Sequence, residues 1–549
     1  MRFQSAPSAD GVSEAEARPL ESSPWAPLRH RAFALLWVGV LLSGMGTWMQ
    51  TLGAQWLLVD APHATVLVSL VQAANTLPIM LFAMPAGVLA DSFDKRWLLV
   101  VVQGYFLVTG VALLVLTLAG WMPASLLLVF TFLLGVGAAF QLPAWQASTP
   151  ELVPRQQLRA AARLEMVGIN VSRAAGPAVA GLVIARWGVP TVFGLNAVSV
   201  IPLGIALLFW HRPRTALPGG REPFWSALRA GGRYAWHDSA VRRILMRLTL
   251  FLLPAAALWA LLPIVATQRL AVGAGGYGVM YAALGVGAIV GALVLGQVRR
   301  ALSTNATLAA GGVLMTVSLA MLVVVPTYPL ALVVLVAAGL SWTTTISTLV
   351  AELQLFLPRW VMARGMAIWT MIFLGCQAVG ALVWGLVAAQ IGLVATFVIT
   401  SVLALVAVGL GMLRRVPDAG AEDLDPVAYW GEARVALPPD PSIGPVQVMV
   451  TYEIAGDAQG EWLAAMRALR RSRLRTGASR WELYRDAEQR DRFVEQFRVA
   501  TWEEHLRQHD GSRLTAADQM VEQTALAFSD PPAVANHYLP PGDDAASAE

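Results

Sequence analysis

The sequence has little charge, a single lysine and a single cysteine. Asp, Glu, Lys and Arg make up 13% of its 549 residues, about half of what a soluble globular protein carries. The one cysteine, Cys376, excludes an internal disulfide framework and a thiolate metal cluster. The one lysine, Lys95, is not preceded by the glycine pattern of a nucleotide-binding P-loop, which argues against transport driven by ATP. With 56% hydrophobic residues, most of the chain is expected to lie in lipid.

Long apolar segments recur along the chain. A helix that crosses a bilayer needs about 20 apolar residues. We predict twelve such helices, with no histidine in any of them, at residues 33–58, 65–90, 97–119, 124–147, 161–185, 190–210, 244–268, 275–298, 305–326, 329–352, 364–389 and 391–413. Because this number is even, both termini are expected on the same side of the membrane.

The arginines are concentrated in alternate loops. The second, fourth, eighth and tenth loops and the long loop 211–243 carry nearly all loop arginines, whereas the other loops offer Arg186 and Arg269. Since positive charge favours the cytoplasmic side, the even-numbered loops and both termini are predicted to be cytoplasmic. The basic pI near 9.4 is therefore attributed to membrane edges and predicts no nucleic-acid partner.

Composition divides the chain into seven segments. We predict a disordered cytoplasmic tail without a signal peptide, a six-helix bundle, a cytoplasmic loop whose amphipathic helix tethers the two halves, a second six-helix bundle, a Pro-rich linker, a cytoplasmic α+β domain and a disordered tail, at residues 1–30, 31–210, 211–243, 244–414, 415–444, 445–530 and 531–549.

The segment 445–530 has the pattern of a small soluble domain. Residues 446–454 alternate like a strand, and 458–474 read as an amphipathic helix. Two further strands are predicted at 481–485 and 493–499, followed by helices at 502–508 and 516–525. The order strand–helix–strand–strand–helix fits a ferredoxin-like unit, although a fourth strand is not evident.

The two hydrophobic halves match at one fixed offset. Gly87 corresponds to Gly291, since 291 − 87 = 204, and the same shift carries Gly135 onto Gly339 and Gly181 onto Gly385. A duplicated helical unit predicts two pseudo-repeats that face each other across a central cavity, as in secondary transporters. The fold class is thus an all-α membrane protein with a small C-terminal α+β domain.

The loop after the second apolar segment carries a recognisable motif. Gly87, Asp91, Lys95 and Arg96 resemble the signature of the major facilitator superfamily, with Ser92 and Asp94 departing from its usual pattern. The second half has a weaker copy at Gly291, Arg299 and Arg300. The resemblance implies that these residues gate the cytoplasmic side, because charges at helix ends can pair when that side closes. The alternative for Lys95 and Arg96 is a purely topological role.

Other motifs point to a branch of that superfamily. Gly176, Pro177 and Gly181 resemble the Gly-Pro motif of exporters and would form a hinge. The opening segment 23–37 and the segment 170–173 are similar to the transmembrane secretion effector branch. This resemblance implies a multi-pass transporter in the bacterial plasma (inner) membrane that exports a drug, siderophore or secondary metabolite by proton-coupled alternating access. Residues 445–530 resemble the dimeric α/β barrel of antibiotic biosynthesis monooxygenases, which implies self-association.

Arg173 is the main candidate for a functional charge, because it lies near the middle of its predicted helix. A charge there costs from about 2.5 to over 10 kcal/mol unless it meets a partner or a cavity. Asn170, Arg173 and Pro177 share one helix face. Arg173 is expected to bind an anionic substrate group or to stabilise a nearby carboxylate; a structural bond to backbone carbonyls is the alternative. Glu165, two turns nearer the cytoplasm, is the candidate proton carrier.

Tryptophan and amide side chains are abundant in the predicted helices. The candidates for the cargo path, besides Glu165, Asn170 and Arg173, are Gln50, Asn75, Gln141, Trp145 and Gln377. Such a lining suits a bulky amphipathic cargo, although many membrane tryptophans lie at the lipid interface instead. The remaining membrane-region carboxyls, Asp60 and Glu352, are expected at helix boundaries.

Two histidines lie four residues apart in a predicted helix. His505 and His509 could share a metal, but no third ligand is suitably spaced, so we expect solvated histidines, no metal and no cofactor. The alternatives that the sequence leaves open are import of a small organic solute, and a transporter fused to a cofactor-independent monooxygenase-like or ligand-sensing domain.

Overall fold

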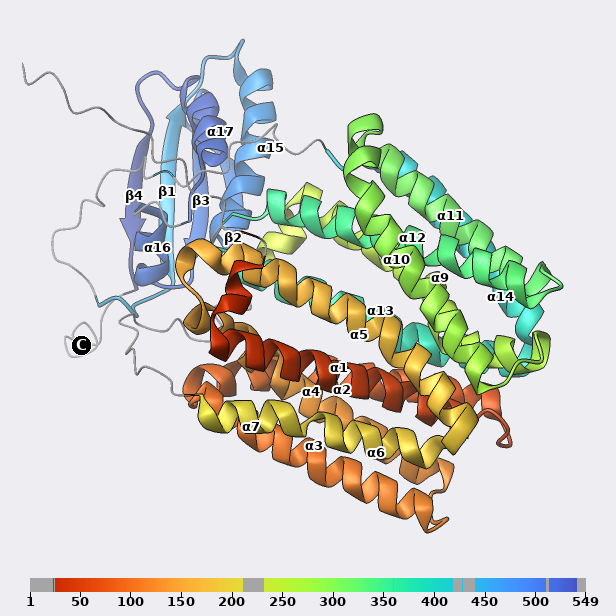
Figure 1. The fold of residues 1–549 in the computed structure, drawn as a ribbon. Helices are drawn as coiled ribbons and strands as arrows, with labels where there is room; N and C mark the ends of the chain where they lie inside the picture. Colours follow the sequence, from red (N-terminus) through yellow and green to blue (C-terminus); the bar gives the residue numbers. More distant parts are fainter. Residues whose placement is uncertain are drawn as a thin grey trace, which may run out of the picture.

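The computed structural model describes residues 23, 25–210, 232–358, 360–417, 427, 440–509 and 513–540. Long helices dominate this part of the chain (Figure 1). They are α1 Arg31–Leu57, α2 Ala64–Ser92, α3 Lys95–Leu118, α4 Ala124–Leu152, α5 Leu158–Trp187, α6 Val189–Ser199, α7 Ile201–Phe209, α9 Ser239–Ile264, α10 Ala274–Ala301, α11 Thr304–Val324, α12 Tyr328–Phe356, α13 Met362–Ile391 and α14 Leu393–Leu413. Among the described residues, twelve helical segments are long and apolar enough to cross a membrane, which confirms the predicted number.

The helices contain a few irregular places, one of which lies beside a proline. The span Val189–Phe209 is divided into α6 and α7 at Val200, because Pro202 supplies no backbone N–H and clashes with the preceding turn. Elsewhere proline is tolerated inside a helix, as at Pro177 of α5. After α9, residues Val265–Arg269 continue as a short π-helical turn.

The second set of helices begins earlier than predicted. The helix expected from residue 244 starts at Ser239, because the Asp238 carboxylate accepts hydrogen bonds from the backbone N–H groups of Ala240 and Val241. A helical turn at 232–237 precedes it. The rest of the amphipathic helix predicted in the loop, up to residue 231, lies outside the described residues. The predicted N-terminal tail is also too long, since Ala26–Arg29 forms a 3-10 turn.

The helices form two sets with similar pairwise packing, α1 to α7 and α9 to α14, which are called the first and second halves. Helix α2 packs on α4 as α10 packs on α12, and α1 packs on α5 as α9 packs on α13. The halves meet through α5 with α10 and through α2 with α13. The end of the membrane part that carries the C-terminal residues is called the near end, and the opposite end the far end (Figure 1).

The C-terminal residues form a separate unit with its own core, the C-terminal unit (residues 440–509 and 513–540). Its elements are β1 Val446–Glu453, α15 Gln459–Thr476, β2 Arg480–Arg485, β3 Arg492–Val499, α16 Trp502–His509, α17 Ala516–Leu526 and β4 Val534–Tyr538. The strands form one antiparallel sheet in the order β2-β3-β1-β4. Burial alternates along β1, so one face of the sheet packs on α15 and α17 around Trp462 and Phe497.

Strand β4 corrects the predicted C-terminal boundary. Residues 531–549 are predicted to be a disordered tail, yet Val534–Tyr538 pairs with β1, with His537 opposite Val448. The strand is five residues long and alternates only weakly between apolar and polar side chains. It therefore gives little periodic signal, and its pairing with β1 is what stabilises it.

Candidate functional site

A cavity of about 290 Å³ opens among α1, α2, α4 and α5 in the near half of the membrane part. Its wall combines aromatic, amide and aliphatic side chains with a single carboxylate. The lining residues are Trp37, Val40, Leu41, Gly44, Trp48, Ile79, Ala138, Gln141, Leu142, Trp145, Gln146, Glu165, Gly168, Ile169 and Ser172. Three of the predicted path residues, Gln141, Trp145 and Glu165, are therefore brought together in it.

Glu165 is the acidic group of this cavity. The Thr149 hydroxyl of α4 donates a hydrogen bond of 2.5 Å to its carboxylate. Trp37 is fixed beside it, because its indole N–H donates to the Leu164 carbonyl at 3.0 Å. One half-buried carboxyl thus lies where a cargo and water can both reach it. The sequence identified Glu165 but not Thr149, which lies 16 residues away.

Arg173 lies deeper, between the two halves. Its guanidinium stands 5.5 Å from the ring centroid of Trp48, a cation–π arrangement. On its other side is a small cavity that it shares with Trp259, Tyr281 and Trp342 of α9, α10 and α12. Its Nε has no hydrogen-bond partner among the described residues. Arg173 therefore lies between Trp48, which belongs to the wall around Glu165, and an aromatic cluster of the opposite half.

The halves are in close contact at the far end. A Cβ atom built on Gly181 of α5 would lie 2.6 Å from the Ala274 carbonyl oxygen of α10. Gly385 of α13 is packed in the same manner against Ser69 of α2. A hydrogen bond of 2.7 Å from the Tyr277 hydroxyl to Gln55 adds a polar contact across this seam. The cavity around Glu165 is thus closed toward the far end.

The predicted hinge residues are packing residues in this structure. A Cβ atom on Gly176 would lie 2.8 Å from Trp48 Cβ and 3.0 Å from the Met45 carbonyl oxygen. The Pro177 carbonyl oxygen would lie 2.8 Å from a Cβ atom on Gly278. Gly176 allows α5 to approach α1, and Gly181 allows it to approach α10.

Lys95 and Arg96 of the predicted gating motif form their contacts with other residues of the first half. Lys95 Nζ lies 2.9 Å from Glu151 Oε1 and donates to the Ala147 carbonyl at 2.9 Å, both on α4. Arg96 donates to the Leu207 and Leu208 carbonyls at the end of α7. The side chain of Asp91 lies outside the described residues.

The two copies of the motif have different surroundings. Gly291 is packed against Leu340, whereas nothing lies within 4 Å of a Cβ atom on Gly87. Arg299 and Arg300 are exposed. Among the described residues, neither Arg299 nor Arg300 makes an ion pair like the one between Lys95 and Glu151.

Besides Arg173, four predicted path residues do not line the cavity. Gln50 is buried, with its amide nitrogen unpaired among the described residues. The Asn75 amide donates to Thr51 at 3.4 Å, and the Asn170 amide donates to the Met166 carbonyl at 2.9 Å. Gln377 is half-buried on α13.

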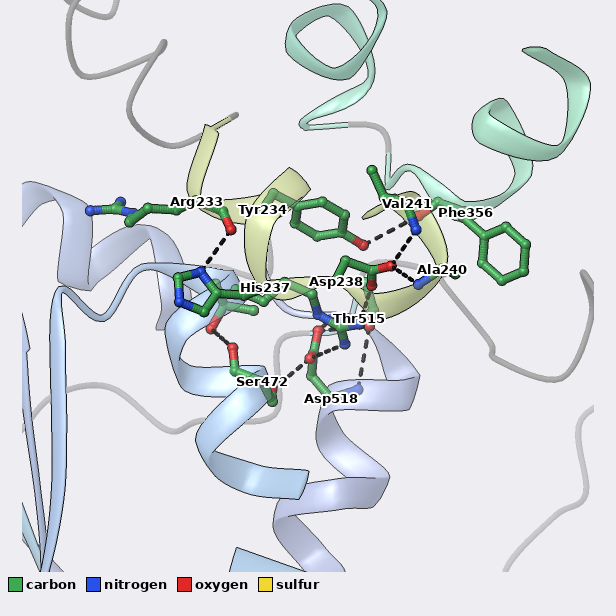
Figure 2. A network of polar contacts seen from close by, with 12 residues as sticks. Arg233, Tyr234, His237, Asp238, Ala240, Val241, Phe356, Ser472, Thr515 and Asp518 are labelled. Carbon is green, nitrogen blue, oxygen red and sulfur yellow. Dashed lines mark hydrogen bonds and ion pairs between the residues drawn. The ribbon is translucent and has the colours of Figure 1, made fainter. Parts of the chain in front are cut away.

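Salt bridges join the C-terminal unit to the near end. Arg475 of α15 lies 2.9 Å from Asp238 and 2.7 Å from Asp518 of α17. Figure 2 shows Asp238 between the first turn of α9 and this polar network. Arg233 pairs with Glu504 of α16 at 2.6 Å. Burial acts to raise the pKa of Asp518, but Arg475 and the hydrogen bonds from Ser472 and Thr515 hold that pKa below its ordinary value.

The histidine prediction is wrong in one respect. His505 is 0% exposed rather than solvated, and its Nε2 lies 3.1 Å from Nε2 of His509. A third histidine, His537 of β4, joins them. The sequence signal for it was absent, because His537 lies 28 residues beyond His509 on a strand that the sequence did not predict.

Comparisons with solved structures bear on the fold. The chain superposes on a bacterial homologue of the human lysosomal transporter Spinster, in an inward-facing and unoccupied conformation, with a TM-score of 0.55, 13% identity and coverage of 71% of this chain and 97% of that one. The nucleoside transporter NupG gives 0.58 at 12% identity, over 70% and 99%. At such identities the likeness concerns the fold, and it confirms the predicted transporter fold.

Comparisons with curated proteins give three named relatives. The staphyloferrin A transporter of Staphylococcus aureus is 29% identical over 175 residues, which are 32% of this chain and 44% of the relative. Macrolide efflux protein A of Streptococcus pyogenes is 24% identical over 185 residues, 33% and 45%. The enterobactin exporter EntS of Shigella boydii is 27% identical over 373 residues, 65% and 86%. The chain thus spans less than half of the first two relatives.

A family model described as transmembrane secretion effector matches residues 22–539. The match runs through the helices and through the C-terminal unit to the end of β4. Because it extends over most of the chain, this protein belongs to the transmembrane secretion effector family, a family of membrane transporters.

Proposed function

We propose that this protein exports a small amphipathic molecule across the bacterial plasma membrane by alternating access, with protons as the coupled ion. The observation that carries the proposal is the cavity around Glu165. It lies in the near half of a transporter fold whose far end is closed by Gly181 and Gly385. Such a state takes up cargo from the near side, and rocking of the two halves then exposes it to the far side.

The cargo class is inferred from the wall of the cavity. Trp37, Trp48 and Trp145 offer aromatic surface, and Gln141 and Gln146 offer amide groups. A volume of about 290 Å³ suits a drug-sized molecule or part of a larger one. The relatives named above are exporters or transporters of siderophores and a macrolide efflux protein, which favours a drug, siderophore or secondary metabolite as cargo.

Proton coupling is assigned to Glu165. A carboxyl that a cavity can wet is a suitable carrier, because it can exchange its proton with solvent as access alternates. The Thr149 hydroxyl would stabilise the charged form between cycles. Lys95 with Glu151, and Arg96 with the end of α7, would act at the near-side gate together with Asp91.

The two halves are proposed to be pseudo-repeats. Gly181 and Gly385 are 204 residues apart, the same offset that relates the motif glycines. Gly181 packs on α10 of the second half, and Gly385 packs on α2 of the first. This reciprocal packing is expected of a two-fold arrangement. The near end, and with it both termini and the C-terminal unit, is proposed to be cytoplasmic because loop arginines gather there.

The C-terminal unit is proposed to be a ferredoxin-like module that supports self-association. Its strand order β2-β3-β1-β4 and its two crossover connections favour that topology. The sheet face away from α15 and α17 carries the exposed side chains Tyr484, Val534 and Tyr538. A second copy of the sheet could cover this face, as in the dimeric barrels that the sequence resembles.

Transport in inverted membrane vesicles tests the proposed function. Lipophilic dyes, siderophores and macrolides would be presented with and without a proton gradient. Accumulation that an uncoupler abolishes is the expected result. Accumulation only in right-side-out vesicles would instead support import, and turnover of a compound without movement would support a catalytic C-terminal unit.

A further inference from the structure

Three histidines converge in the C-terminal unit at a place that the transport proposal does not use. His505 and His509 lie one turn apart on α16, and His537 lies on β4. One ring nitrogen from each lies within 4.8 Å of the other two. The ring centroids of His505 and His537 are 4.8 Å apart. Three imidazoles from two separate elements thus face a common point.

From this geometry we propose that His505, His509 and His537 bind one late first-row divalent cation, of which Zn²⁺ is the representative probe. A tetrahedral ion with Zn–N bonds of about 2.0–2.1 Å holds two ligand nitrogens about 3.3 Å apart. The Nε2 atoms of His505 and His509 are already 3.1 Å apart. The ring nitrogen of His537, within 4.8 Å of the other two, would need to move by up to about 1.5 Å to reach the separation of a tetrahedral site.

The surroundings of the histidines support metal binding. The Gln508 carboxamide oxygen lies 3.2 Å from His505 Nδ1, so a proton on Nδ1 leaves the lone pair of Nε2 directed at the other rings. This is the outer-shell arrangement that orients metal-binding histidines. Gln508 is itself buried and bonds the Thr476 carbonyl. Trp502 covers the cluster, with its ring 5.3 Å from that of His505.

The protonation state of the cluster is also suitable. Burial, followed by the two neighbouring imidazoles, lowers the pKa of His505 to about 3. Burial and His509 likewise lower the pKa of His537. Only a neutral imidazole can bind a metal, so no proton has to be removed from these two rings near neutral pH.

Three histidines leave one position of a tetrahedral ion open. Closed structural zinc sites use four protein ligands, whereas sites with three keep a place for water or another small ligand. The ion would also join β4, at the edge of the sheet, to α16. Its expected effect is therefore to hold the last strand on the C-terminal unit and to offer one exchangeable coordination position.

The test uses the full-length protein in detergent, purified without a polyhistidine tag. After dialysis against Zn²⁺ and removal of the excess, elemental analysis should find one equivalent per chain. His537→Gln should lose this equivalent. Because loss of an outer-shell partner alone costs about 10–100-fold in affinity, loss of a ligand should weaken binding at least that much. His63→Asn, in the exposed turn before α2, is the matched control and should keep the ion.

A second measurement covers the case in which His537→Gln fails to fold. His509→Gln changes a half-buried side chain without altering β4, and Co²⁺ reports the coordination geometry through its visible absorption. The expected result is a tetrahedral spectrum in the wild-type protein and its loss in His509→Gln. Equal metal content in the wild type and in both histidine variants, or an octahedral Co²⁺ spectrum throughout, would overturn the proposal.

Discussion

The Arg475 guanidinium lies 2.9 Å from the Asp238 carboxylate, which also caps the first turn of α9. One acidic side chain therefore ends the inter-half loop, starts the second set of helices and binds the C-terminal unit (Figure 2). Arg475 also binds Asp518 and lies over the ring of Tyr234. The contact is a shared network rather than an isolated surface ion pair.

Replacing Arg475 should release the C-terminal unit from the near end. Arg475→Ala leaves Asp238 and Asp518 buried without their cation, and breaking a buried pair in this way costs about 3–5 kcal/mol. We expect a lower urea midpoint and faster proteolytic release of the C-terminal unit. Arg471→Ala, on the exposed side of the same helix, should change stability by less than about 0.5 kcal/mol. Equal proteolysis of the two variants would contradict the assignment.

The same network should make stability depend on pH. Because the folded-state pKa of Asp518 is lowered from 3.8, its carboxylate contributes stability above that ordinary value. This contribution is lost as the pH falls below it and the folded carboxyl takes up a proton. Unfolding of the full-length protein in detergent, followed between pH 6 and pH 3, should lose less stability on acidification in Asp518→Asn than in the wild type. An unchanged pH profile in the variant would count against the network.

Neutralising Glu165 should uncouple transport from the proton gradient. Glu165→Gln keeps the shape of the cavity and can still bond Thr149, but it cannot carry a proton. Without a proton carrier the gradient can no longer drive transport, so gradient-driven uptake should fall to the level measured with an uncoupler while cargo binding persists. Asp60→Asn, at an exposed position after α1, is the control. Full gradient-driven uptake by Glu165→Gln would remove Glu165 from the proton path.

Cargo binding should depend on both the shape and the charge of the side chain at position 173. Arg173→Ala removes the cation over Trp48, an interaction worth about 0.5–2 kcal/mol. Because Trp48 lines the cavity, its ring should be held less firmly, and cargo binding should weaken by at most the equivalent of that free energy, about 30-fold. Arg173→Lys keeps the charge without the planar group and should be intermediate. Arg163→Ala, exposed about three turns nearer the start of α5, should behave as wild type. Normal transport by both Arg173 variants at equal expression would defeat the prediction.

Adding a methyl group at Gly181 should open the far-end contact between the two halves. In Gly181→Ala the new Cβ would lie 2.6 Å from the Ala274 carbonyl oxygen, so α5 and α10 must separate. In a Cys376→Ser background, Ser69→Cys reports on the other far-end contact, where Ser69 is buried against Gly385. Its labelling by an impermeant maleimide should rise in Gly181→Ala. Gly104→Ala, with nothing within 4 Å of the new atom, should leave labelling low.

The helices could be predicted from the sequence because lipid requires a long apolar segment for each of them. Secondary structure that follows from the pattern of neighbouring residues could also be predicted, such as the strand and the helix that begin the C-terminal unit. The start of α9 could have been found from Asp238, a residue type that favours helix N-termini. It was missed because hydropathy marks the apolar part of a helix and not its polar first turn.

Contacts between residues far apart in the chain could not be predicted from the sequence. Thr149 and Glu165 come from different helices, as do Lys95 and Glu151, and no spacing rule relates them. Arg173 could be singled out as a charge in the middle of a predicted helix, but its aromatic neighbours in the second half depend on how the halves dock. His537 was missed for the same reason, together with the weak alternation of β4.

Both salt bridges described between the C-terminal unit and the membrane part end on residues 233–238, just before α9. The unit is therefore rigidly attached to the beginning of the second set of helices. If the halves rock, it should travel with that set as a rigid extension outside the lipid. Its position outside the membrane part would mark one half in single-particle images, so that the tilt of that half could be measured directly.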